Sequence, residues 1–157
     1  MPVLINNQQS SHRIDQGSLH RQARDILGAL DCGECELSIL IVDDSRMAEL
    51  NRQYLRREGP TNVIAFPMRS EDFAHLHPEL LGDVVLSADT ALLEAKELGQ
   101  SFEERMLNLL IHGILHLLGY DHQKGKDGRR HMDEKAHELL EKVAETAAHI
   151  STRPQIT

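Results

Sequence analysis

Met106-Leu-Asn-Leu-Leu-Ile-His-Gly-Ile-Leu-His-Leu-Leu-Gly-Tyr-Asp-His122 is the stretch that decides the fold. Residues 106–118 are apolar on nearly every face of a helix, which predicts a helix buried inside the protein. The stretch is interrupted by His112 and is too short to span a bilayer. Polar residues nevertheless recur along it at spacings of three and four, which places them on one stripe: Arg105, Asn108, His112 and His116. Polar side chains on a buried helix need partners.

The histidines of this stripe have the spacing of metal ligands. His112 and His116 are four residues apart, so both imidazoles can reach one zinc ion from the same helix face. Gly119 predicts the end of the helix and lets the chain turn back, so that His122 can supply a third ligand. Three histidines leave the fourth tetrahedral position open, which is typical of catalytic zinc. The alternative is that each histidine is an ordinary core residue with its own hydrogen-bond partner.

The same spacing, H-x-x-x-H-x-x-G-x-x-H, occurs in metzincin proteases, with one difference. The general-base glutamate of those enzymes is replaced here by Gly113. Without that carboxylate, the usual route for deprotonating water and protonating the leaving amine is missing. The pattern therefore favours the metal geometry over the protease mechanism.

Outward from this stretch, strands alternate with helices in the first half of the chain and helices fill the second. Strands are expected at 2–5, 36–42, 62–66 and 83–87. Ser18 is expected to cap the first helix, and one of residues 43–45 the second. A third helix, capped by Ser87 or Asp89, ends at Gly99, and Ser101 with Glu104 forms a capping box for the central helix. A last amphipathic helix has one apolar face: Met132, Ala136, Leu139, Leu140, Val143 and Ala147.

Composition fits one ordinary globular domain, expected over residues 1–150 with a flexible tail at 151–157. The chain has 157 residues, 40% of them hydrophobic and only 3% aromatic. Residues 1–9 do not resemble a signal peptide, so the expected location is cytoplasmic, with no membrane partner. In that compartment Cys32 and Cys35 are expected to be reduced. Their C-x-x-C spacing also suggests redox chemistry or zinc binding, but two incidental loop thiols are favoured.

The formal net charge of −8 argues against a general nucleic-acid binder. Local basic clusters can still contact phosphates if they flank a site. Otherwise they are solvated surface charges. The candidates are Arg52, Arg56 and Arg57; Lys124, Lys126, Arg129 and Arg130; and the isolated Arg69.

Residues 112–122, HGILHLLGYDH, closely resemble the signature of the YbeY-type endoribonuclease and rRNA maturation family. Residues 50–54 and 60–67 resemble the same family, as do residues 81–87, and the resemblance covers about residues 36–140. It implies an α+β fold in one domain, with a small mixed sheet of about four strands, about five helices and a central buried helix carrying two zinc ligands. It also implies a metal-dependent hydrolase, an endoribonuclease that holds one zinc ion through His112, His116 and His122. The implied substrate is single-stranded rRNA at the 3′ end of the small ribosomal subunit, with a role in ribosome quality control.

Two departures from the family pattern concern the same region. The family has an arginine directly after the tyrosine that matches Tyr54, where this chain has Leu55 followed by Arg56 and Arg57. The family's T-D-V-L-S-F appears here as residues 61–66, TNVIAF, which removes one carboxylate and one hydroxyl. Arg56 and Arg57 are therefore the candidate catalytic residues, as guanidinium groups that stabilise charge on phosphorus.

The mechanism has further open points. Asp121 either orients a ligand histidine or is a simple turn residue. No general base can be named, and the nucleophile is either water or the RNA 2′-hydroxyl, which would favour RNA over DNA. Two other functions remain alternatives: a metzincin-like protease with Glu71 or His75 as its base, and a non-catalytic ribosome-associated zinc protein. The small ribosomal subunit and its proteins are candidate partners, and DNA is not expected.

Overall fold

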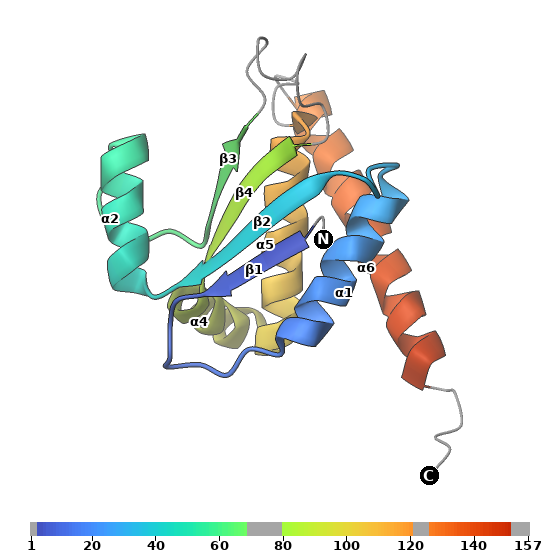
Figure 1. Cartoon of the computed structure of the whole chain (residues 1–157), viewed down its shortest axis with the longest axis horizontal. Helices are drawn as coiled ribbons and strands as arrows, with labels where there is room; N and C mark the ends of the chain where they lie inside the picture. The colour runs from blue at the N-terminus through green and yellow to red at the C-terminus, as the bar shows by residue number, and fades with distance from the viewer. Residues whose placement is uncertain (1–2, 69–79, 121–125, 152–157) are drawn as a thin grey trace.

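Four strands and five helices form the part of the chain that the computed structural model describes, residues 3–68, 80–120 and 126–151 (Figure 1). For residues 126–128 and 145–151 the structure describes the backbone alone. The elements follow one another as β1 Val3–Asn7, α1 Gln16–Ala29, β2 Glu36–Val42, α2 Asp44–Leu55, β3 Val63–Pro67, β4 Leu80–Ser87, α4 Ala88–Leu98, α5 Phe102–Leu117 and α6 Lys126–Ser151. None of these described helices is long and apolar enough to cross a membrane.

The strands form one mixed sheet in the order β1-β2-β4-β3. β1 and β4 both run parallel to β2, while β3 pairs with β4 in the antiparallel direction. Parallel strands are usually covered on both faces, and their sequences are accordingly apolar throughout, as in residues 36–42, ELSILIV. β4 begins at Leu80, three residues before the expected start, because its pairing with β2 continues to Glu36.

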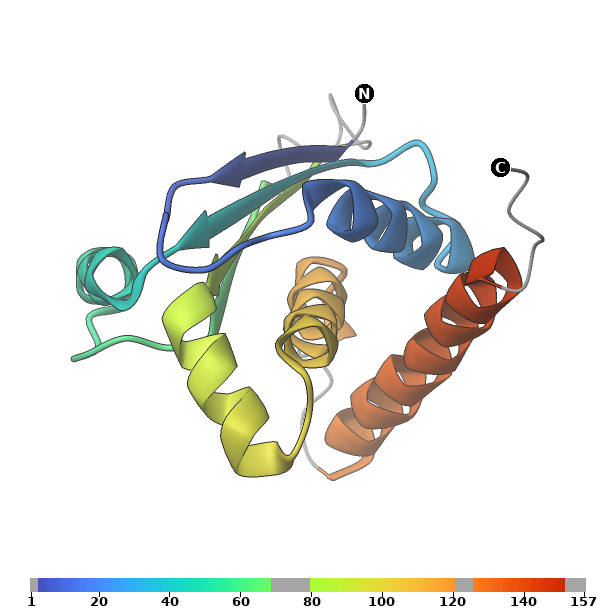
Figure 2. The ribbon, with the colours of Figure 1, turned by 90° about the horizontal axis from the view of Figure 1, so that it is seen from below.

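Helices cover the two faces of the sheet unequally. Figure 2 shows α2 alone on one side, while α5 lies on the other side, enclosed by the sheet, α1, α4 and α6. The larger core cluster fills that enclosed side and includes the fully buried Leu110, Ile111, Ile114 and Leu115 of α5. Burying each of these side chains contributes about 1.5–3 kcal/mol to the free energy of folding. The expected α+β domain with a buried central helix is therefore confirmed.

Helix ends follow the local sequence in most places. Ser101 accepts a hydrogen bond from the backbone N–H of Glu104 and begins α5, and Gly99 ends α4 in the left-handed conformation. Ser87 rather than Asp89 caps α4, and Asp43 caps α2. The expected cap at Ser18 is wrong: Asp15 begins α1, and its carboxylate accepts the N–H of Ser18. A carboxylate three residues upstream satisfies that N–H, so the helix extends one turn further back.

Candidate metal centre on the central helix

The polar stripe of α5 is present as expected and is the only break in its burial between Met106 and Leu117. Asn108, His112 and His116 are half-buried, and every other residue in that interval is buried. Arg105, one turn before Asn108, is half-buried as well. The helix then ends at Leu117 with Leu118 as its C-cap, and Gly119 follows with a φ of 85° and donates its N–H to the carbonyl of His116. The chain therefore leaves α5 directly after the second histidine, where the sequence predicted a turn.

The ring of His112 is held in one orientation by its own helix. Its Nδ1 lies 2.8 Å from the backbone carbonyl oxygen of Asn108. Because a carbonyl can only accept, Nδ1 carries the hydrogen and the neutral ring keeps its lone pair on Nε2. Metal-ligating histidines characteristically donate their second ring nitrogen in this way, which fixes both tautomer and orientation. His112 thus fits a zinc ligand, with His116 one helical turn further on.

The remaining members of the expected site, His122 and Asp121, lie outside the described residues. Within residues 3–68, 80–120 and 126–151, three or more histidine, cysteine, aspartate or glutamate side chains do not come together as a metal-binding group. The described part of the site is therefore the histidine pair on α5. Imidazole donors at this spacing match the donor set that zinc prefers.

The packing around Gly113 leaves no room for the glutamate that metzincin proteases carry at this position. A Cβ at this position would lie 2.7 Å from Cγ1 and 3.1 Å from Cγ2 of Val84 on β4, and 3.2 Å from Cγ2 of Val63 on β3. Carbon atoms in ordinary contact are 3.4–4 Å apart. The close approach of α5 to the sheet leaves room for hydrogen alone, so a carboxylate cannot project from this residue without moving the helix. The bases suggested for a protease, Glu71 and His75, lie outside the described residues.

An ion pair continues the stripe toward α4. Arg105 donates from Nε and from Nη2 to Oε1 of Glu94, at 3.0 Å in each case. Nδ2 of Asn62 lies 3.2 Å from both carboxylate oxygens of Glu94. An aspartate at position 62, as in the family pattern, would instead set two carboxylates against each other. The amide therefore joins the start of β3 to α4 and α5.

The two candidate arginines lie in a different layer. Arg56 follows α2 in the left-handed conformation, with φ 54° and ψ 39°, and Arg57 comes next; both side chains are exposed. α2 packs on the opposite face of the sheet from α5 (Figure 2). The connection from Arg56 to β3 reaches the free edge of the sheet, since β3 is the outermost strand on that side. An arginine from this turn can approach the α5 face only around that edge.

The other basic clusters are only partly described. Arg129 and Arg130 are exposed in the first turns of α6. Arg69 and Lys124 lie outside the described residues, as do His75 and His77.

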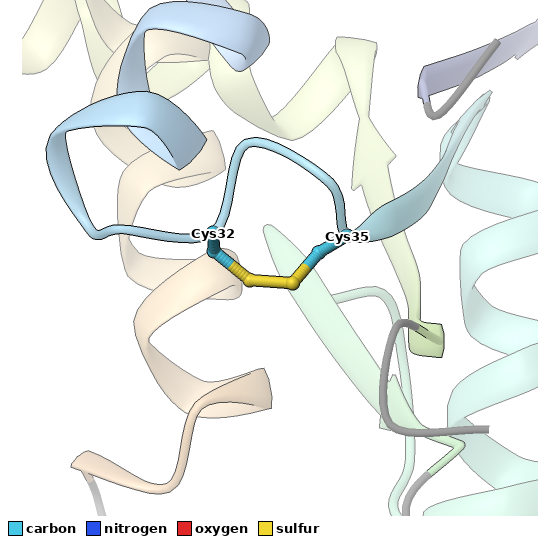
Figure 3. The surroundings of a disulfide bond; sticks show 2 residues. All are labelled: Cys32 and Cys35. Atoms are coloured by element: carbon cyan, nitrogen blue, oxygen red, sulfur yellow. A yellow bond between two sulfur atoms is a disulfide. The ribbon is translucent and has the colours of Figure 1, made fainter. Parts of the chain in front are cut away.

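Cys32 and Cys35 form a disulfide, so the expectation of two reduced, incidental thiols is wrong for this structure (Figure 3). The bond closes the short turn between α1 and β2, with the two Cα atoms 5.2 Å apart. The turn brings these positions within bonding distance, because Cys32 donates its N–H to Leu27 and its carbonyl accepts the N–H of Cys35. Both residues are 8% exposed.

A second polar cluster, at the ends of β2 and β4, was not anticipated from the sequence. Asp44 Oδ1 accepts from Ser87 Oγ at 2.6 Å and from Thr90 Oγ1 at 2.5 Å. Asp89 accepts the N–H of Asp44 at 2.9 Å and lies 2.7 Å from His12 Nε2. The Asp44 N–H, and then the His12 ring, hold the pKa of the Asp89 carboxyl below its ordinary value. The cluster pins three segments together.

A four-stranded mixed sheet around a buried helix that carries two half-buried histidines one turn apart defines the chain as an α+β protein. A family model described as endoribonuclease YbeY matches residues 4–144. The chain is 45% identical over 144 residues to the endoribonuclease YbeY of Syntrophotalea carbinolica, covering 91% of this chain and 96% of the relative. The corresponding protein of Geobacter sulfurreducens is 46% identical over 141 residues, 89% of this chain and 94% of the relative.

A further relative and a solved structure are similar to the chain over most of its length. Endoribonuclease YbeY of Aquifex aeolicus is 41% identical over 132 residues, 84% of this chain and 86% of that protein. The solution structure of TM1509 from Thermotoga maritima superposes with a TM-score of 0.65 at 25% identity, covering 99% of both chains. The chain belongs to the endoribonuclease YbeY family.

Proposed function

We propose that this chain is a zinc-dependent endoribonuclease that cleaves single-stranded rRNA during maturation of the small-subunit 3′ end and in ribosome quality control. The observation that carries the proposal is the histidine pair of α5, with the His112 tautomer fixed by Asn108, in a chain of the YbeY family. A cytoplasmic location belongs to the proposal because its substrate is ribosomal RNA. The small ribosomal subunit and its proteins are the proposed partners.

The metal ligands in this proposal are His112, His116 and His122. When bound, the ion supplies Lewis acidity for a phosphoryl oxygen, for a water nucleophile or for both. The protein's contribution is to hold the imidazoles: the Asn108 carbonyl accepts from Nδ1 of His112 and so directs Nε2 of the neutral ring toward the metal position, and the buried helix restricts the movement of both rings. Asp121 is proposed to accept a hydrogen bond from one of the ligand rings.

In this proposal, exposed arginines bind the phosphate groups of the RNA substrate. The formal net charge is −8, so phosphate binding falls to exposed arginines such as Arg56 and Arg57. Arg105 is a weaker candidate for phosphate binding, because its guanidinium is already paired with the carboxylate of Glu94. A planar guanidinium placed at the scissile phosphate stabilises the negative charge that develops there. Selectivity for RNA follows if the 2′-hydroxyl takes part, either as nucleophile or as a recognised group.

A cleavage assay tests this function. The purified protein, His116→Ala and His137→Ala would be incubated with a single-stranded RNA ending in the small-subunit 3′ sequence, with duplex RNA and single-stranded DNA as controls. His137 is the matched control because its side chain is 75% exposed on α6 and pairs with Glu141. We expect cleavage of the single-stranded RNA alone, abolished in His116→Ala and retained in His137→Ala.

Other results would point to the alternatives. Casein degradation that depends on His116 would indicate a protease, although the packing around Gly113 leaves no place for the usual glutamate. Zinc binding without cleavage of any RNA would indicate a non-catalytic ribosome-associated protein.

A further inference from the structure

The turn after α2 holds an arginine in a backbone conformation that arginine rarely adopts. Arg56 has φ 54° and ψ 39°, the left-handed region in which a side chain costs about 1–2 kcal/mol. Arg57 follows it, and Gly59 then has a φ of 81°. Strained backbone persists only where surrounding contacts hold it, so the contacts of this turn identify what fixes it.

Asn51 and its neighbour Arg52, inside α2, make those contacts. The Arg52 carbonyl accepts the N–H of Arg56 at 3.2 Å, and the Asn51 carbonyl accepts the N–H of Arg56 and, at 3.3 Å, the N–H of Arg57. The side-chain Nδ2 of Asn51 donates to the carbonyl oxygen of Gly59 at 2.9 Å. Asn51 therefore ties both ends of the turn, and the two arginine side chains project from a segment whose backbone is fixed.

The Asn51 side chain is not explained by packing alone. It is 3% exposed and lies next to Leu50 of the smaller core cluster, where an apolar residue would bury more simply. Its Oδ1 is buried and has no hydrogen-bond partner among the described residues, a cost of about 1–3 kcal/mol. The hydrogen bond from Asn51 Nδ2 to Gly59 therefore explains why a buried amide is present here although its Oδ1 has no partner among the described residues.

We infer that Asn51 is a positioning residue for RNA binding: it presets the turn from which Arg56 and Arg57 contact the phosphodiester backbone of single-stranded RNA. This inference rests on the proposed function and assigns Asn51 no contact with RNA. A preset turn means that less conformational freedom is lost when the guanidinium groups engage phosphates. Replacing Asn51 therefore weakens binding while leaving the chemistry at the α5 histidines intact.

The test measures KM, kcat and the salt dependence of RNA binding. Asn51→Ala is compared with the wild type, with Arg56→Ala/Arg57→Ala, and with the triple variant. Gln9→Ala is the matched control, since Gln9 is a buried amide, 8% exposed, that ties a different loop through His12. Asn51→Asp keeps the side-chain volume and removes the donor, and it replaces Asn51→Ala if that variant does not fold.

We expect Asn51→Ala to raise KM roughly tenfold, the equivalent of removing one charge-assisted hydrogen bond, and to lower kcat by no more than Arg56→Ala/Arg57→Ala does. The slope of log binding constant against log salt should fall by about 0.7 for each phosphate of the single strand that the protein no longer neutralises. Adding Asn51→Ala to the double arginine variant should change neither KM nor slope further. Gln9→Ala should keep the wild-type values.

Several results would overturn the inference. A wild-type KM and salt slope in Asn51→Ala, with both changed in the arginine variant, would refute the role of Asn51 alone. A further rise in KM on adding Asn51→Ala to the arginine variant, or failure of both Asn51 variants to fold, would show that the residue serves the fold. Unchanged KM and slope in Arg56→Ala/Arg57→Ala would remove the arginine role in the proposed function, and this inference with it.

Discussion

Replacing Gly113 with alanine tests the close approach of α5 to the sheet, on which the placement of both histidines depends. The added Cβ would lie 2.7 Å from Cγ1 of Val84, well inside ordinary contact. Gly28, near the end of α1, provides the matched control because a Cβ there meets nothing within 4 Å. Both substitutions gain from the higher helix propensity of alanine, so the difference between them isolates the contact.

The structure sets the size of that difference. Overpacking a well-filled core costs about 1–3 kcal/mol, while Gly→Ala at an open helical site stabilises by about 0.4–1 kcal/mol. We therefore expect Gly28→Ala to be at least as stable as the wild type and Gly113→Ala to lie about 2 kcal/mol below Gly28→Ala. For a chain of this length that gap is about 4–8 °C in Tm. Gly113→Glu should be worse still and should not create a protease.

Urea unfolding of the two variants, followed by circular dichroism, provides the assay. Val84→Ala removes the two methyl groups nearest the new Cβ, so the double variant Gly113→Ala/Val84→Ala should be more stable than the sum of the single effects predicts. If Gly113→Ala is as stable as Gly28→Ala, or if the effects at Gly113 and Val84 simply add, the helix does not pack on the sheet as described.

Three further predictions concern the other polar features. Glu94→Gln should destabilise the protein by about 1–3 kcal/mol by leaving Arg105 without its anion, as measured by urea unfolding; an unchanged midpoint would contradict the ion pair. Asp89 has a lowered pKa, so its stabilising effect is complete above its unfolded value of ~3.9 and is lost as the pH falls through the lower folded value. The stability difference between wild type and Asp89→Asn should thus shrink as the pH falls below about 4, and a difference that stays the same between about pH 5 and pH 3 would refute it. Reduction of the Cys32–Cys35 bond should lower stability by about 2 kcal/mol, from the entropy of closing a four-residue loop, and alkylation of the unfolded protein without reductant should label neither thiol.

Features that depend on residues only three or four positions apart could be predicted from the sequence. The α5 stripe follows from the helical repeat, because Arg105, Asn108, His112 and His116 are the polar residues of a run whose other members are apolar. Ser101 and Gly99 mark their helix ends through bonds to residues three or four positions away. The sequence identifies Gly113 as a departure from the protease pattern, and the structure gives the steric reason, which is the pair of methyl groups of Val84.

Features that depend on distant segments were missed. His12 and Asp89 are 77 positions apart, and nothing near His12 in the sequence indicates a carboxylate partner. The insertion of β4 between β2 and β3 is likewise a choice of topology that the strand sequences do not encode locally. The N-cap of α1 is Asp15 and not Ser18. Aspartate and serine are both good N-caps and these two lie three residues apart, so the sequence alone does not decide between them.

Zinc content and RNA cleavage, measured on the same preparations, test the central claim most directly. The set consists of the wild type, His112→Ala, His116→Ala, His122→Ala and the exposed control His137→Ala. We expect a single zinc ion per chain and cleavage of single-stranded RNA in the wild type and in His137→Ala, with both abolished or strongly reduced in the other three variants. Full zinc content in any of those three, or cleavage that persists without zinc, would contradict the account.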